Sequence, residues 1–136
     1  MKKRKYIFLL IILIVLIIFA IFNAFNKSKL TYIRNESNLN TFYFQDNMVV
    51  FDCDIIIKNN TKKDIEFYMD ADISNELGLT KDSIAIGYNK NTKKRVFFIE
   101  ENSQKNFEVE FKALKGDKKE KSNRLPPKDI IIKIKN

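Results

Sequence analysis

Several residue types on which enzyme chemistry depends are absent or scarce in this chain of 136 residues. It contains no histidine, one cysteine, three glycines and two prolines. Without histidine, the commonest general base, the usual base of a catalytic triad and the usual zinc ligand are missing. A single cysteine excludes an internal disulfide, a thiolate metal cluster and a paired-cysteine redox motif. The glycines, Gly78, Gly87 and Gly116, are isolated, which excludes a glycine-rich phosphate loop.

Carboxylates are the remaining candidates for chemistry, because a glycosidase needs only two Asp or Glu side chains. The sequence holds two Asp-x-Asp motifs, Asp52/Asp54 and Asp70/Asp72. If their strands paired directly, four carboxylates would face one another and would need a cation such as Ca²⁺ between them. If the strands lie apart, neighbouring lysines neutralise exposed acids. We expect the second arrangement, and therefore no catalytic residue, no cofactor and no metal site in a domain with no obvious cleft.

One long apolar segment stands near the N-terminus. Every residue from Tyr6 to Phe22 is apolar or aromatic, and the run continues to Phe25 with only Asn23 interrupting it. As a helix of about 20 residues it spans about 30 Å, the thickness of the hydrocarbon core of a bilayer. A buried helix of a soluble domain would carry a polar stripe, and this segment has none. The sequence predicts a basic tail over 1–5 and a transmembrane helix over 6–25.

The flanking residues favour an uncleaved anchor over a cleaved signal peptide. A signal peptide has a shorter apolar region followed by small residues, whereas bulky Phe22 stands near the end of this run. Four basic residues, Lys2 to Lys5, precede the helix, and basic residues mark the cytoplasmic side. Lys27, Lys29 and Arg34 follow it, so the asymmetry is modest. We expect a single-pass protein of the cell membrane with a cytoplasmic N-terminus and an extracytoplasmic C-terminal domain.

The net charge of +8 does not require a nucleic-acid partner, because half of it lies in the tail before the helix. Arginines are also few, and bidentate phosphate contacts depend on them. The abundance of Lys, Ile and Asn, which have A- and T-rich codons, suggests an AT-rich genome and a Gram-positive bacterium. The single cysteine, Cys53, falls on the apolar face of a predicted strand, where a buried thiol is expected.

After a linker or first edge strand over 26–38, a period-two alternation predicts half-buried strands through 39–136. The four clearest strands place apolar residues on one face: Val49, Phe51, Cys53, Ile55 and Ile57; Ile65, Phe67, Met69, Ala71 and Ile73; Phe107, Val109, Phe111 and Ala113; and Ile130, Ile132 and Ile134. Weaker strands are predicted at 41–45, 83–88 and 95–100, and a short helical turn at 74–79. With few glycines, we expect asparagine at positive-φ turn positions.

About seven short strands in about 100 residues are typical of an antiparallel β-sandwich. The segments 54–61 and 98–111 resemble the strand–turn–strand pattern of small membrane-anchored envelope proteins of Gram-positive bacteria with an immunoglobulin-like ectodomain. This resemblance covers roughly residues 40–136. It implies an all-β, immunoglobulin-like sandwich after the N-terminal transmembrane helix, and no site or activity.

The C-terminal part of the domain is basic. Its basic residues are Lys112, Lys115, Lys118, Lys119, Lys121, Arg124, Lys128, Lys133 and Lys135. Three functions remain open. The first is a membrane-tethered interaction module, an accessory or binding component of an envelope complex that recognises a protein partner by a strand edge or loop. The second is contact with an anionic polymer or anionic lipid through the 112–128 loop. The third is a small carboxylate-based hydrolase.

Overall fold

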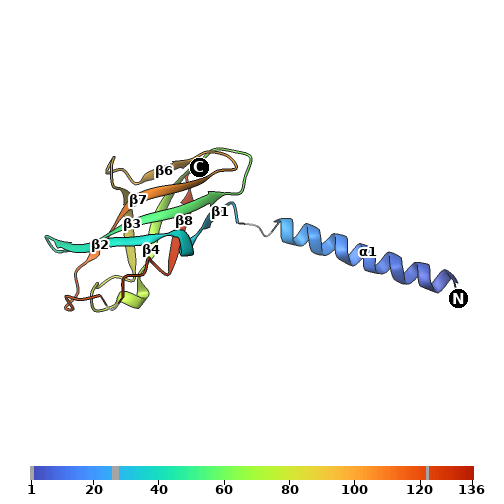
Figure 1. Ribbon diagram of the computed structural model, residues 1–136, viewed down its shortest axis with the longest axis horizontal. Coiled ribbons are helices and arrows are strands. Elements are labelled where there is room, and N and C mark those ends of the chain that lie inside the picture. Colours follow the sequence, from blue (N-terminus) through green and yellow to red (C-terminus); the bar gives the residue numbers. More distant parts are fainter. Residues whose placement is uncertain (1, 26–27, 122) are drawn as a thin grey trace.

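A computed structural model describes residues 2–25, 28–121 and 123–136, and it consists of one N-terminal helix followed by an all-β domain (Figure 1). The elements in chain order are α1 (Lys2–Phe25), β1 (Leu30–Tyr32), the 3₁₀ turn η1 (Arg34–Glu36), β2 (Asn38–Gln45), β3 (Met48–Asn59), β4 (Ile65–Asp72), the 3₁₀ turn η2 (Ser74–Glu76), β5 (Ile84–Asn89), β6 (Val96–Ile99), β7 (Gln104–Leu114) and β8 (Asp129–Ile134).

Helix α1 leaves the domain beside β1 and packs against nothing else in the described chain (Figure 1). Its stretch from Arg4 to Ala24, 21 residues long, is long and apolar enough to cross a membrane. In water such a helix would leave its large apolar side chains exposed, as they are here. The apolar run thus does form a helix, and that helix is not a core element of the domain.

The eight strands form one antiparallel sheet, and its longest pairing joins β3 to β7. Eleven residue pairs join these strands, from Met48↔Leu114 to Lys58↔Gln104. The order across the sheet is β1-β3-β7-β5-β4-β6, while β2 pairs with β3 and β8 with β4. Strands β1 and β2 therefore share one edge of β3. Because β8 pairs with Phe67–Asp72, β5 and β6 share the opposite edge of β4.

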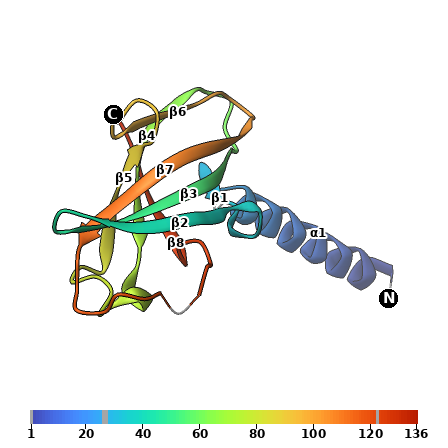
Figure 2. The same cartoon turned by 60° about the vertical axis from the view of Figure 1, so that its left-hand side comes forward.

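The sheet curls so that its two ends approach each other (Figure 2). The Tyr32 hydroxyl of β1 donates to the carbonyl oxygen of Pro127, two residues before β8, at 3.0 Å. Burial raises the pKa of this tyrosine to about 12. The predicted all-β class and N-terminal helix are confirmed. The two-sheet sandwich and its immunoglobulin-like arrangement are not, since the strands form one curled sheet of eight rather than two stacked sheets of about seven.

The apolar faces predicted from alternation line the inside of the curl. Phe67, Phe97 and Phe107 form the centre of the core, with ring centroids 5.6–5.8 Å apart. The prediction that Ile130, Ile132 and Ile134 all face the core holds only for the first part of β8. Ile130 is buried, whereas Ile134, the last residue of the strand, is 39% exposed. Asparagine was expected at the positive-φ turn positions, and Asn102 does occupy one. Asp46 and Lys93 occupy two others.

Candidate interaction surfaces

The structure separates the two Asp-x-Asp motifs. β7 and β5 lie between β3 and β4 in the sheet, so Asp52 and Asp54 are not opposite Asp72 and Asp70. On the outer face of the sheet, Asp52 instead opposes Glu110 of β7, and Asp54 opposes Glu108. Like charges directly opposite one another destabilise a sheet unless something neutralises them. The juxtaposed carboxylates are thus contributed by β3 and β7, a pairing that alternation alone does not reveal.

Lysines of the loop between β5 and β6 neutralise the Asp52 and Glu110 carboxylates. Lys90 Nζ lies 2.6 Å from an Asp52 carboxylate oxygen, and Lys93 Nζ lies 3.1 Å from Glu110. The hydrogen bond to Asp52 raises the pKa of Lys90. Asp52 and Glu110 are left only 8% and 6% exposed. Both carboxylates are therefore engaged by lysines and covered, which leaves neither open to a substrate.

Asp70 and Asp72 of β4 have separate local partners. Arg95 donates to Asp70 at 2.6 Å, and its guanidinium lies over the rings of Tyr68 and Tyr88, with 5.7 and 6.0 Å to the centroids. Asp72 accepts the backbone N–H of Ser74, which lowers the pKa of this carboxyl. Within residues 2–25, 28–121 and 123–136, no three His, Cys, Asp or Glu side chains are grouped to hold a metal ion.

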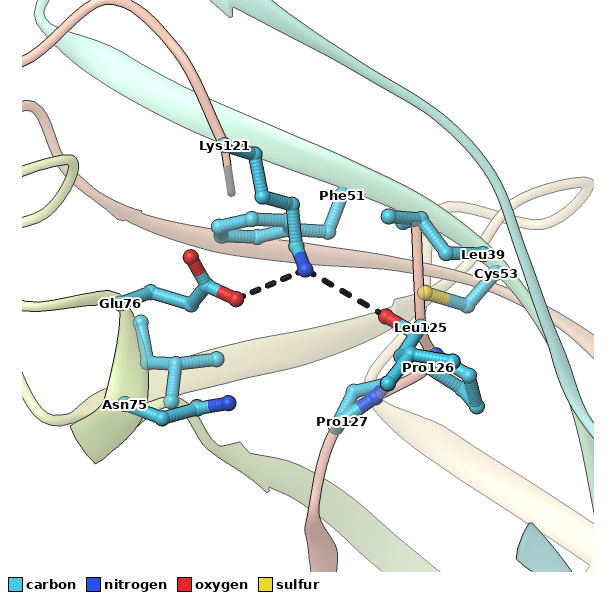
Figure 3. A pocket seen from close by; sticks show the side chains of 10 residues that line it. Leu39, Phe51, Cys53, Asn75, Glu76, Lys121, Leu125, Pro126 and Pro127 are labelled. Carbon is cyan, nitrogen blue, oxygen red and sulfur yellow. Dashed lines mark hydrogen bonds and ion pairs between the residues drawn. The ribbon is translucent and has the colours of Figure 1, made fainter. Parts of the chain in front are cut away.

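Residues 115–121 and 123–128, together called the strap below, lie between β7 and β8 in the chain, and Lys121, Leu125 and Pro127 of this strap line a pocket beside β3 (Figure 3). Lys121 of the strap points inward, and its Nζ lies 2.7 Å from the Glu76 carboxylate; the two side chains are 5% and 7% exposed. The space left between them and Cys53 is about 10 Å³, about that of one water molecule. Burial raises the pKa of the Cys53 thiol to about 12. This pocket is therefore a packed seam and not a ligand site.

The basic residues of the C-terminal part do not form one surface. Lys112 lies over the Tyr88 ring on the outer face, and Lys115 lies 4.9 Å from the centroid of Phe44. The Lys121 side chain is buried, whereas Lys119 and Lys128 are exposed. The strap begins after Leu114, opposite Met48, at the end of β3 away from Leu30 and α1. Positive charge that looks continuous in the sequence is thus divided among three environments.

Strand β2 offers an open edge. It pairs with β3 on one side, and no second strand among the described residues pairs with its other side. Its eight residues, Asn38 to Gln45, include no charged side chain, and Tyr43 and Phe44 are 38% and 37% exposed. Native edge strands are usually protected by lysine, proline or short length. β8 carries Lys133, and β1 and β6 have only three and four residues, so β2 is the least protected edge.

A groove runs beside this edge. It has a volume of about 150 Å³ and is lined by Leu39, Asn40, Thr41, Phe42 and Arg124. The pairing with β3 slips between Leu39 and Thr41, which places a bulge at the groove. The sequence predicted a strand at 41–45 but not its role as an edge. The run of uncharged residues from Asn38 to Gln45 was the available signal.

No protein-family model, curated protein or solved structure matches this chain.

Proposed function

We propose that this chain is a single-pass membrane protein whose β domain lies outside the cytoplasm and binds a protein of the bacterial envelope without catalysing a reaction. The partner supplies an extended segment that adds to the sheet along β2. The basic tail over 2–5 supports the orientation, because such residues are retained on the cytoplasmic side. The abundance of Lys, Ile and Asn supports a Gram-positive bacterium with an AT-rich genome as the source.

The open, uncharged edge of β2 is the observation that carries the proposal. Even-numbered residues of β3 direct their backbone groups towards β1 and β2, as the hydrogen bond from Ile33 to the Ile56 carbonyl shows. Phe42 and Phe44 pair with odd-numbered residues, so their N–H and C=O groups point away from β3. An added strand would satisfy these groups, and side chains of the partner would enter the groove beside Arg124.

Two lysines on the edge strand test this mode of binding. Thr41→Lys/Tyr43→Lys places charge on the outer side of β2, near Asp52 and Glu110, so the fold is retained while strand addition is opposed. The matched control, Ile84→Lys/Ile86→Lys, adds the same charge to the outer face of β5, which is paired on both sides.

The assay is photocrosslinking in intact cells with a crosslinking residue at Phe44 of the full-length protein. We expect a discrete adduct that Thr41→Lys/Tyr43→Lys reduces about 10-fold, corresponding to about 1.4 kcal/mol of binding free energy, and that the control pair leaves unchanged. Equal loss in both variants, or an adduct that both leave intact, would refute recognition through β2. An adduct of twice the chain mass would identify a second copy of this chain as the occupant.

A further inference from the structure

A second groove lies at the end of the domain next to α1. Only four residues separate Phe25 from Leu30, so these two Cα atoms are at most about 17 Å apart. Leu30 pairs with Asn59, which brings the β3–β4 loop, residues 60–64, to the same end (Figure 1). Asn60 fixes this arrangement: its backbone N–H donates to the Lys29 carbonyl and its side chain donates to the Ser28 carbonyl, both at 2.9 Å.

The groove has a basic rim and an apolar floor. Its volume is about 460 Å³, and its lining comprises Lys29, Thr61, Lys62, Lys63, Asp64, Ile65, Glu66, Ile134 and Lys135. Both acids are engaged, since Asp64 accepts the backbone N–H of Glu101 at 2.9 Å and Glu66 pairs with Lys135 at 3.0 Å. Lys29, Lys62 and Lys63 are exposed and pair with no carboxylate among the described residues.

We propose that this groove binds the phosphate headgroup of an anionic phospholipid in the membrane that holds α1. The inference rests on the anchoring in the proposed function, because the short connection to Phe25 is what brings the groove to the headgroup layer. Lys29, Lys62 and Lys63 supply donors for the phosphate, and Ile65 with Ile134 meets the first carbons of the acyl chains. This site differs from the 112–128 loop considered above for contact with an anionic polymer or lipid, since it lies at the opposite end of β3.

The contact orients the domain on the bilayer. Anchoring by α1 alone holds the domain to the bilayer at one point, whereas three lysines at the headgroup layer add a second point of attachment. Each lysine near an anionic surface contributes about a fivefold gain in affinity, so three contribute about 100-fold. The attraction weakens at high salt, because the Debye length falls from about 8 Å at physiological ionic strength to about 3 Å at 1 M.

The test uses the full chain reconstituted in nanodiscs of phosphatidylcholine alone or with phosphatidylglycerol added, and measures amide hydrogen exchange over residues 60–64. We expect exchange to slow by up to about 100-fold with phosphatidylglycerol, and to return to the phosphatidylcholine rate in Lys29→Gln/Lys62→Gln/Lys63→Gln. The matched control, Lys81→Gln/Lys119→Gln/Lys128→Gln, removes the same charge from exposed sites elsewhere and should behave as the unsubstituted chain.

This experiment distinguishes a failure of the proposed function from a failure of the lipid site alone. A chain that does not enter the nanodiscs lacks the anchor, which would overturn the proposed function and the lipid site together. A chain that enters them but exchanges equally in both lipids would overturn the lipid site alone. Equal loss of protection in the control variant would do the same, because it would show a dependence on net charge and not on this groove.

Discussion

Replacing Lys121 with methionine tests whether the strap is held by a buried ion pair. The lysine and Glu76 are 2.7 Å apart, with side chains 5% and 7% exposed. Removing one partner of a buried pair leaves an uncompensated charge and typically costs about 3–5 kcal/mol. A domain of this size is stable by about 5–15 kcal/mol in total. We therefore expect Lys121→Met to lower the melting temperature by about 12 °C or more, at about 4–8 °C per kcal/mol.

The double variant Glu76→Leu/Lys121→Met separates the charge from the packing. With both charges gone, apolar side chains replace the ion pair beside Leu39 and Phe51, and such replacements are often neutral or stabilising. The measurement is thermal unfolding of the full chain in detergent, monitored by the far-ultraviolet circular dichroism of the β-sheet. A single variant as stable as the parent chain, or a double variant less stable than the single one, would refute the reasoning.

Three further predictions concern the core. Val109 is fully buried and Glu108 is exposed, so Val109→Asp should cost about 3 kcal/mol or more by denaturant unfolding and Glu108→Lys less than about 1 kcal/mol; equal costs would mean that the faces of β7 are misassigned. A Cβ at Gly87 would lie 2.1 Å from the Met69 carbonyl oxygen, so Gly87→Ala should cost about 1–3 kcal/mol, and an unchanged melting temperature would contradict this close approach. Because burial raises the pKa of Cys53 from 9.0 to about 12, the unfolded state releases its proton first and stability should fall as the pH rises from 9 towards 12; Cys53→Ser should flatten that fall, and rapid alkylation of the native thiol at pH 8 would show that it is not buried.

Local patterns in the sequence were enough to predict the features that depend only on neighbouring residues in the chain. The apolar run from Tyr6 to Phe25, interrupted only by Asn23, predicts a helix, since a segment that crosses a bilayer must satisfy its backbone groups within itself. Alternation in β3, β4 and β7 determined which side chains face the core, because a shift by one residue would turn Glu108 and Glu110 towards the core. Both predictions needed only the period of each element.

Features that depend on which strand pairs with which could be seen only in the folded domain. Alternation is the same in one curled sheet and in two stacked sheets, so the expected sandwich could not be distinguished from the observed curl. Pairing of β3 with β7 placed Asp52 against Glu110, and the β5–β6 loop then covered both. Lys121 has a polar sequence context, yet the return of the chain to β8 buries it against Glu76. Register, edges and loop paths follow from contacts between distant residues, whose free energies no local pattern contains.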